Sequence, residues 1–108
     1  MSLRIYLGEL EELVLLLVML LGKEAYGVAL TEELKKHAAR EISISAVHAV
    51  LHRLEKKGFV KSEMGGATAE RGGRRKRMFS ITSFGQNAVQ EARDTRANIW
   101  TLIANSPA

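Results

Sequence analysis

The sequence has 108 residues, of which 46% are hydrophobic and 26% charged, and these values are typical of a single globular domain with a modest core. It contains no cysteine, which excludes disulfide bonds, thiol catalysis and thiolate metal sites. Its longest apolar run, residues 13–21, is much shorter than the roughly 20 residues that a membrane-spanning helix needs.

The net charge of +4 is distributed unevenly along the chain. Between Arg53 and Arg77 there are nine basic and three acidic residues, so this segment carries +6 and the remainder of the chain carries −2. A strongly cationic segment within a mildly acidic chain is typical of a protein that binds a polyanion with one face.

The first predicted helix covers residues 7–21. Its first half is amphipathic and acidic, which suits a helix N-terminus, whereas its second half is apolar on every side. A helix that is apolar all round must be covered all round. In so small a domain we expect a second chain to provide part of this cover, the alternative being packing within one chain. The residues expected at the contact between chains are Leu13, Leu16, Leu17 and Leu20.

Two more helices are predicted in close succession. Gly27 opens the first, over residues 28–39, and a short link at residues 40–42 leads to the second, over Ser43–Gly58, with its serine as N-cap and its glycine after the C-terminus. The second helix has one apolar stripe, formed by Val47, Val50, Leu51 and Leu54. A helix, a short connection and a second helix form the helix-turn-helix arrangement, in which the second helix reads DNA.

The face of the Ser43–Gly58 helix opposite this stripe is polar. It presents small and hydrogen-bonding side chains near its start and cations near its end, namely Ser45, Ala49, His52 and Lys56, with His48 and Arg53 on its flanks. Such a face can enter a DNA major groove, with short side chains near base edges and cations near phosphates. The alternative is an ordinary solvated helix face.

Two strands are predicted next, over residues 59–64 and 77–81, joined by a glycine-rich cationic segment. We interpret this hairpin as a β-wing. Thr82 then caps a final helix over residues 83–104, and residues 105–108 form a tail. In the final helix the residues expected to contact a second chain are Ala92, Ile99, Trp100 and Ile103.

The cations of the wing are the strongest chemical signal in the sequence: Arg71, Arg74, Arg75, Lys76 and Arg77. Neighbouring glycines allow the backbone to approach phosphates closely, and each arginine can bind two phosphate oxygens. An arginine at the tip could also enter a narrow minor groove. The alternatives are a solvated run of charges and a nuclear-localisation signal.

Four stretches together resemble the PadR family of bacterial transcriptional regulators: LGELEELVLLLVMLLG at Leu7–Gly22, AYGVAL at Ala25–Leu30, VHAVLHRLEKKGFV at Val47–Val60 and ERGGRRKRMFSIT at Glu70–Thr82. The chain departs from the family pattern where His48 and Ala49 stand in place of a Tyr-Pro pair, and where Ala69 and Ser83 stand in place of prolines.

The resemblance implies a mainly α-helical fold with a small β-wing, that is, a winged helix-turn-helix at residues 1–82 followed by a C-terminal dimerisation helix and tail at 83–108. It also implies a cytoplasmic, nucleoid-associated homodimer on inverted-repeat promoter sites, usually a repressor. The expected DNA-binding residues are Tyr26, Ser43, Ser45, His48, His52, Lys56, Arg71, Arg74, Arg75, Lys76 and Arg77. For Tyr26, packing against the first helix is the alternative.

Other functions are weighed against this one. Trp100 is expected in the dimer core, the alternative being that two tryptophans line a cleft and stack on a planar aromatic effector whose binding releases DNA. A further alternative is a winged-helix protein-interaction module. His48 and His52 have a spacing that can hold zinc, with Glu55 nearby, but further ligands are not evident. We expect no metal, no cofactor, no membrane partner and no enzymatic activity, because the sequence lacks catalytic and nucleotide-binding motifs.

Overall fold

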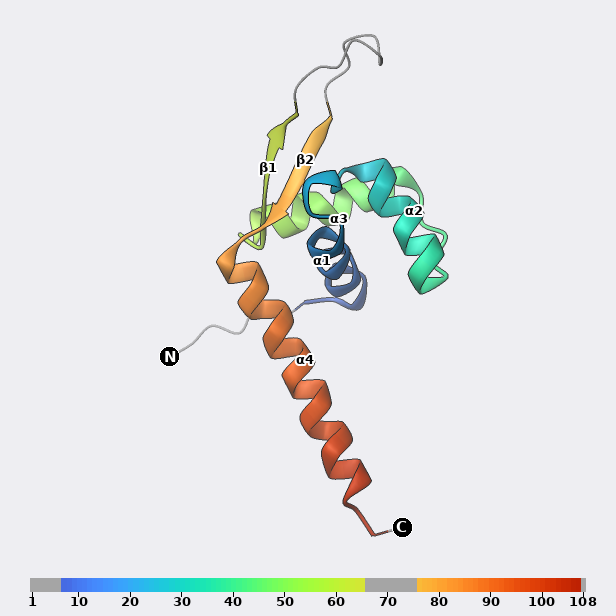
Figure 1. Ribbon diagram of the computed structural model, residues 1–108, viewed down its shortest axis with the longest axis vertical. Helices are drawn as coiled ribbons and strands as arrows, with labels where there is room; N and C mark the ends of the chain where they lie inside the picture. Colours follow the sequence, from blue (N-terminus) through green and yellow to red (C-terminus); the bar gives the residue numbers. More distant parts are fainter. Residues whose placement is uncertain (1–6, 66–75, 108) are drawn as a thin grey trace.

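The computed structural model describes residues 7–65 and 76–107. Within these ranges the elements are α1 (Glu9–Leu21), a 3-10 helix (Gly22–Glu24), α2 (Gly27–Ala38), α3 (Ile44–Lys56), β1 (Val60–Met64), β2 (Arg77–Ile81) and α4 (Ser83–Ala104). Helices α1 to α3 form the body of the molecule, the two strands extend from one side of it, and α4 leads away from it (Figure 1). The predicted fold, mainly helical with a small two-stranded sheet, is therefore confirmed.

Local capping explains where α3 and α4 begin and end. Ser43 precedes α3, and its Oγ accepts a hydrogen bond from the Ala46 N–H at 3.1 Å. After α3 the chain turns at Gly58, whose φ of +80° is in the left-handed region that favours glycine. Thr82 caps α4 in the same way as Ser43 caps α3, because its Oγ1 accepts from the Gly85 N–H at 3.0 Å.

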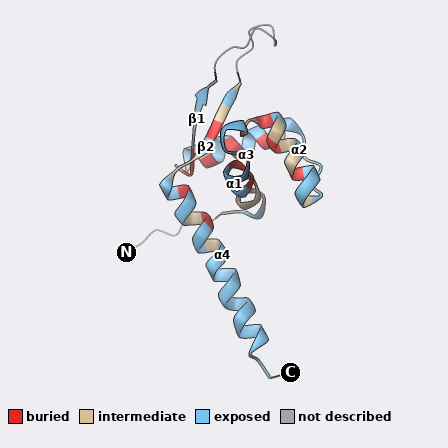
Figure 2. Cartoon of the chain, viewed as in Figure 1, coloured by how far each residue is buried: buried red, intermediate tan, exposed pale blue. Residues whose placement is uncertain are grey.

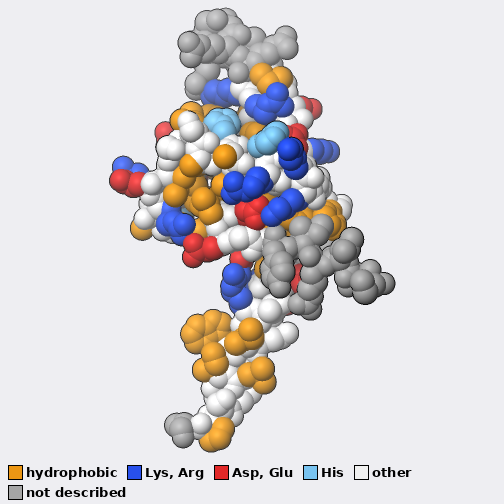
Figure 3. Space-filling model, turned by 180° about the vertical axis from the view of Figure 1, so that it is seen from behind, with side chains coloured by type: hydrophobic (Ala, Val, Ile, Leu, Met, Phe, Trp, Pro, Cys, Tyr) orange, Lys and Arg blue, Asp and Glu red, His pale blue; other side chains and the backbone are white. Residues whose placement is uncertain are grey.

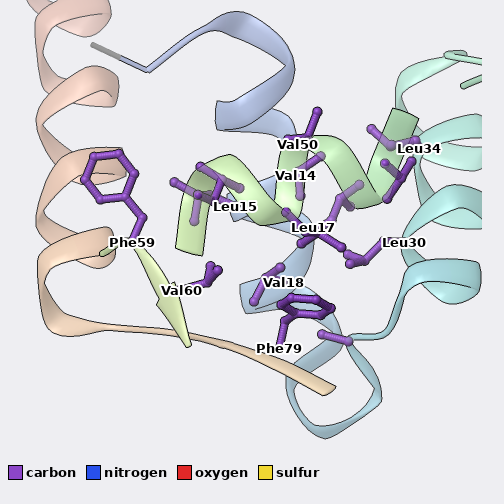
Figure 4. Packing of buried hydrophobic residues seen from close by; sticks show 14 of the residues in the cluster. Val14, Leu15, Leu17, Val18, Leu30, Leu34, Val50, Phe59, Val60 and Phe79 are labelled. Carbon is purple, nitrogen blue, oxygen red and sulfur yellow. The ribbon is translucent and has the colours of Figure 1, made fainter. Parts of the chain in front are cut away.

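The hydrophobic core lies between α1, α2 and α3 and continues beneath the sheet. The predicted apolar stripe of α3 is buried, with no member more than 2% exposed: Val47, Val50, Leu51 and Leu54. Figure 4 shows side chains of α1 and α3 packed together, with Leu30 and Leu34 from α2 beside them. Phe59, Val60 and Phe79 extend this cluster from the helices to the strands. The core therefore fixes α3 and the base of the sheet relative to each other.

The two strands pair antiparallel, with Val60 opposite Ile81 and Met64 opposite Arg77. β2 is also attached to the connection between α1 and α2, because the Phe79 N–H donates a hydrogen bond to the Ala25 carbonyl oxygen at 2.8 Å. The two strands are therefore held to each other by their pairing, and the sheet is held to the helical body by this hydrogen bond.

Helix α4 is buried against the body only near its beginning. Gly85 and Val89 are its buried residues, Ala88 and Ala92 are half-buried, and every described residue from Arg93 onward is exposed. Figure 2 shows the change from buried to exposed along this helix. The predicted boundary at residue 82 coincides with the start of α4, but Val89 belongs to the same core as the other helices, so a division into two domains stays a prediction.

Substituting alanine for Gly85 is expected to lower the stability of the protein by about 3 kcal/mol. A Cβ atom at this position would lie 2.1 Å from the Phe59 carbonyl oxygen, so either α4 or the start of the sheet would have to move. Chemical unfolding would measure the loss. The control is Asn87→Ala, an exposed position on the same helix. A Gly85→Ala protein as stable as this control would contradict the close approach.

Candidate nucleic-acid interface

The outward face of α3 is available for contact along its whole length. We call it the reading face and define it by the exposed side chains Ser45, His48, Ala49, His52 and Lys56. Ser43, also predicted to bind DNA, lies at the start of this face, and its hydroxyl oxygen already accepts the capping hydrogen bond of α3. Figure 3 shows histidine side chains together with lysine and arginine side chains on one side of the body. The structure thus places the α3 residues predicted from the sequence on one continuous surface.

Tyr26, His48 and Lys76 come together at the N-terminus of α2. The Lys76 Nζ lies over the Tyr26 ring, 3.8 Å from its centroid, which is a cation–π contact. The ring of His48 lies against Gly27, where an added Cβ would be 2.6 Å from its Nε2. Tyr26 therefore packs against a cation of the wing. Since the dipole of a helix favours anions at its N-terminus, the charge of Lys76 and the start of α2 together suit a phosphate of a polyanion.

The wing cations fall into two groups. Arg71, Arg74 and Arg75 lie outside the described residues, so their predicted role stays a prediction. Lys76 and Arg77 are described, and Arg77 begins β2 opposite Met64, at the end of the paired strands away from Val60 and Ile81. The Arg77 guanidinium donates a hydrogen bond from Nη1 to Ser62 Oγ at 2.9 Å, so within this structure it contacts the neighbouring strand.

A buried carboxylate that sequence reasoning missed holds the C-terminal end of α3. Glu11 is 6% exposed, and both its carboxylate oxygens accept hydrogen bonds from Lys57 Nζ, at 2.9 and 2.8 Å. Its Oε1 also accepts from the Gly8 N–H at 2.7 Å, and Arg53 Nε lies 3.7 Å from its Oε2. Burial by itself would raise the pKa of Glu11, but these hydrogen bonds and positive charges outweigh burial and lower the pKa.

Two neighbouring carboxylates connect α1 to other elements. Glu9 pairs with Arg40 of the link before α3, at 2.7 Å, and Glu12 pairs with Arg96 of α4. Together with Glu11, these residues form what we call the acidic turn (Glu9, Glu11 and Glu12). The only sequence signal for it was the acidic start of the first helix, which is also explained by the helix dipole. The acidic turn therefore connects the start of α1 to the end of α3, to the link before α3 and to α4.

Replacing Glu11 with Gln is expected to lower the stability at neutral pH by roughly 2 kcal/mol, because Lys57 loses its charged partner. The pKa of Glu11 is lowered by folding, so the unfolded chain binds the proton more tightly. The stabilisation is therefore complete above the ordinary value of 4.5 and is lost as the pH falls through the folded pKa. Urea unfolding between pH 3 and 7 would measure this. Wild type and variant should converge in acid, whereas the exposed control Glu32→Gln should follow wild type throughout.

The residues predicted to contact a second chain fall into two groups, one covered by its own chain and one exposed. Leu17 is 7% exposed within the core of its own chain, and Leu13 and Ala92 are half-buried. The others are exposed: Leu16, Leu20, Ile99, Trp100 and Ile103, together with Met19 and Leu102, which the sequence prediction did not include. The single chain therefore already covers Leu17. An apolar surface remains on α1 and on the outer half of α4, where Figure 3 shows a cluster of hydrophobic side chains.

A groove of about 260 Å³ lies between α1 and α4. Leu16, Met19 and Val89 give it an apolar lining, and its polar lining residues are Glu12, Gln90, Arg93 and Arg96. Trp100, the predicted effector contact, is 70% exposed and is not among the residues that line this groove.

The parts of the chain that the structure describes contain no group of three His, Cys, Asp or Glu side chains that could hold a metal ion. In particular, His48, His52 and Glu55 do not form such a group. Glu55 instead accepts a hydrogen bond from Ser62 Oγ at 2.7 Å. Among the described helices, none combines the length and apolar character needed to cross a membrane.

A helix-turn-helix whose second helix is followed by a two-stranded hairpin defines a winged-helix protein, and the cationic surface is the electrostatic pattern of nucleic-acid binding. Residues 15–91 match the model of the transcriptional regulator PadR-like family. The chain belongs to this family, and the predicted resemblance is confirmed. No curated protein matches the chain in a sequence search.

Solved structures of regulators have the same fold. A PadR-like transcriptional regulator from Bacillus cereus aligns with a TM-score of 0.69 and 20% identity, over 89% of this chain and 88% of that one. A PadR family regulator from Eggerthella lenta aligns with a TM-score of 0.66 and 24% identity, over 89% and 83%. One from Clostridium difficile aligns with a TM-score of 0.66 and 18% identity, over 85% and 94%. At these identities the likeness is one of fold.

Proposed function

We propose that this PadR-like regulator binds double-stranded DNA sequence-specifically as a homodimer and represses transcription by occluding an inverted-repeat promoter site. The observation that carries the proposal is the reading face, which is exposed, small near its start and cationic near its end. In a twofold dimer, two such faces about 34 Å apart would enter successive major grooves of one side of the duplex. Lys56, Lys76, Arg71, Arg74 and Arg75 would contact phosphates, and Ser45, His48 and His52 would contact base edges.

The cluster at the start of α2 supports the orientation of this complex. Tyr26 and Lys76 lie together beside the N-terminus of α2, and His48 of the reading face lies against Gly27. A phosphate bound here would sit next to a reading helix in the groove. The backbone contacts would then fix the register in which α3 meets the bases.

The proposed homodimer rests on the apolar surface of α1 and α4. Ile99, Trp100, Leu102 and Ile103 are each more than half exposed and lie on the part of α4 that leads away from the body. Burying a large apolar side chain contributes about 1.5–3 kcal/mol. A second copy of the same helix, supported by Leu16 and Leu20 of α1, would cover this surface.

Binding to the DNA upstream of the protein's own gene tests the proposal directly. Fluorescence anisotropy with this duplex and with an unrelated duplex of equal length should give at least a hundredfold preference for the first. Footprinting should protect two half-sites about one helical turn apart. Equal affinity for both duplexes would contradict sequence-specific recognition, and in vitro transcription would show whether occupancy blocks the promoter.

A second candidate function is the binding of a planar aromatic effector at Trp100. The observation that favours it is the 70% exposure of this indole, which leaves its ring faces open to stacking. Titration with flat aromatic compounds should then quench tryptophan fluorescence and release the operator duplex together. Quenching without release would show binding that does not regulate DNA, and the absence of both effects would contradict an effector site at Trp100.

A further inference from the structure

A hydrogen-bonded chain joins the reading helix to both strands of the wing. Ser62 Oγ on β1 donates to Glu55 Oε2 on the last turn of α3 at 2.7 Å. Arg77 Nη1 on β2 donates to the same Ser62 Oγ at 2.9 Å. A hydroxyl group has one proton to donate and two lone pairs to accept, so both contacts can exist together. We call these three residues the positioning chain (Glu55, Ser62 and Arg77).

The strand register explains why Arg77 takes part. Directly paired residues of an antiparallel sheet lie on the same face, and alternate residues of a strand share that face. Ser62 pairs with Phe79 and Met64 with Arg77, so Arg77 and Ser62 lie on the face that also carries the buried Phe79. Lys76 belongs to the alternate set, and its Nζ lies over the Tyr26 ring. Two neighbouring cations of the wing thus have different surroundings.

We propose that Glu55, Ser62 and Arg77 position the wing relative to the reading helix, and that Arg77 acts mainly through Ser62 rather than as a phosphate ligand. The inference rests on the proposed binding of DNA. The carboxylate, hydroxyl and guanidinium groups polarise one another, and the half-buried site of Glu55 and Ser62 limits competition from water. The wing and the reading face therefore meet the duplex at a fixed separation.

The proposal and a simple charge argument predict opposite effects of one variant on DNA affinity, so this variant distinguishes between them. If Glu55 were only a negative charge near phosphates, Glu55→Ala would strengthen DNA binding. If Glu55 holds the wing through Ser62, the same variant weakens it. Ser62→Ala breaks the chain without any change of charge. Ser62→Thr retains the hydroxyl and suits a strand, so it should rescue binding.

The experiment measures the affinity of the full chain for its upstream duplex and for an unrelated duplex, each over a range of salt concentrations. We expect Ser62→Ala and Glu55→Ala to lower specific affinity about tenfold, as the loss of one or two hydrogen bonds would. The salt slope of Ser62→Ala and its affinity for unrelated DNA should equal those of wild type. Arg77→Gln combined with Ser62→Ala should bind no more weakly than Ser62→Ala alone, because Arg77 acts through Ser62. The matched control is Glu63→Ala, at an exposed carboxylate on the strand that carries Ser62.

Tighter binding by Glu55→Ala together with unchanged binding by Ser62→Ala would overturn the proposal. A salt slope lowered by about 0.9 per chain in Arg77→Gln, with no dependence on Ser62, would assign Arg77 to a phosphate instead. A wild-type protein that binds no duplex would refute the proposed function rather than the chain. In that case, amide exchange without DNA decides: Ser62→Ala should speed exchange in β1 and β2 but not in α1 and α2, and equal exchange would refute the positioning chain.

Discussion

Raising the salt concentration from 50 to 200 mM is expected to weaken the binding of this protein to its DNA by about 10³- to 10⁵-fold. Each phosphate neutralised releases counterions and contributes about −0.9 to the slope of log affinity against log salt, and we expect six to ten such contacts per dimer. The cations held responsible are Lys56, Lys76, Arg71, Arg74 and Arg75. Anisotropy titrations at several salt concentrations give the slope.

Removing two wing cations should change this slope by a defined amount. Arg74→Gln combined with Arg75→Gln removes about four phosphate contacts from a dimer, so the slope should become less negative by about 3.6. The control is Lys35→Gln on α2, where the lysine lies 3.5 Å from Glu41. Affinity that does not depend on salt, or a double variant with the slope of wild type, would exclude the wing from phosphate binding.

Replacing both Trp100 and Ile103 with Glu is expected to convert the dimer into a monomer and to lower operator affinity at least a hundredfold. Each dimer would lose four buried apolar side chains, each worth about 1.5–3 kcal/mol, and would gain charges in their place. A monomer presents one reading face, so it loses the advantage of two linked half-sites. Sedimentation velocity and anisotropy measure the two effects.

The matched control carries the same new charges on the other side of the helix. At 100° per residue, Asn98 and Thr101 lie roughly opposite Trp100 and Ile103 on α4, and all four positions are exposed. Asn98→Glu combined with Thr101→Glu should therefore remain dimeric and bind DNA. If both double variants stay dimeric, the contact between chains lies elsewhere. A monomeric wild type that binds DNA would contradict the dimer itself.

The elements of this fold could be predicted because their signals are local. The apolar stripe of α3 repeats with the period of a helix, and Ser43, Gly58 and Thr82 mark helix ends through contacts with near neighbours. The polar side of α3 follows from the same periodicity. Once the stripe is buried, the opposite side must be exposed.

The contacts between elements could not be predicted in this way. Glu11 and Lys57 are 46 positions apart, and nothing in either local pattern indicates that they meet. The same is true of Gly27 and His48, whose contact depends on how α2 and α3 cross. The sequence predicts Arg77 as a phosphate ligand because it belongs to a run of cations, but its hydrogen bond to Ser62 depends on strand register. The charge pattern thus predicts where the cationic surface lies, but not which of its cations contact phosphates and which contact other residues of the chain.

Leu17 illustrates the limit of an argument from apolarity alone. The run at residues 13–21 is apolar on every side, so the sequence offered no means of separating the residues that face the core from those that face outward. The structure separates them: Leu17 lies with the core of one chain at 7% exposure, whereas Leu20 is 63% exposed. The crossing of α1 with α2 and α3 makes this choice, and it is a property of the tertiary structure.

Because α4 is exposed from Arg93 onward and leads away from the body, the outer half of this helix has few contacts with its own chain to hold it in shape. An isolated helix of a few turns is marginal in water. The melting temperature should therefore rise with protein concentration, and the last turns of α4 should become ordered as subunits meet. The abundance of the regulator in the cell would then set how much of it is fully folded as well as how much is paired.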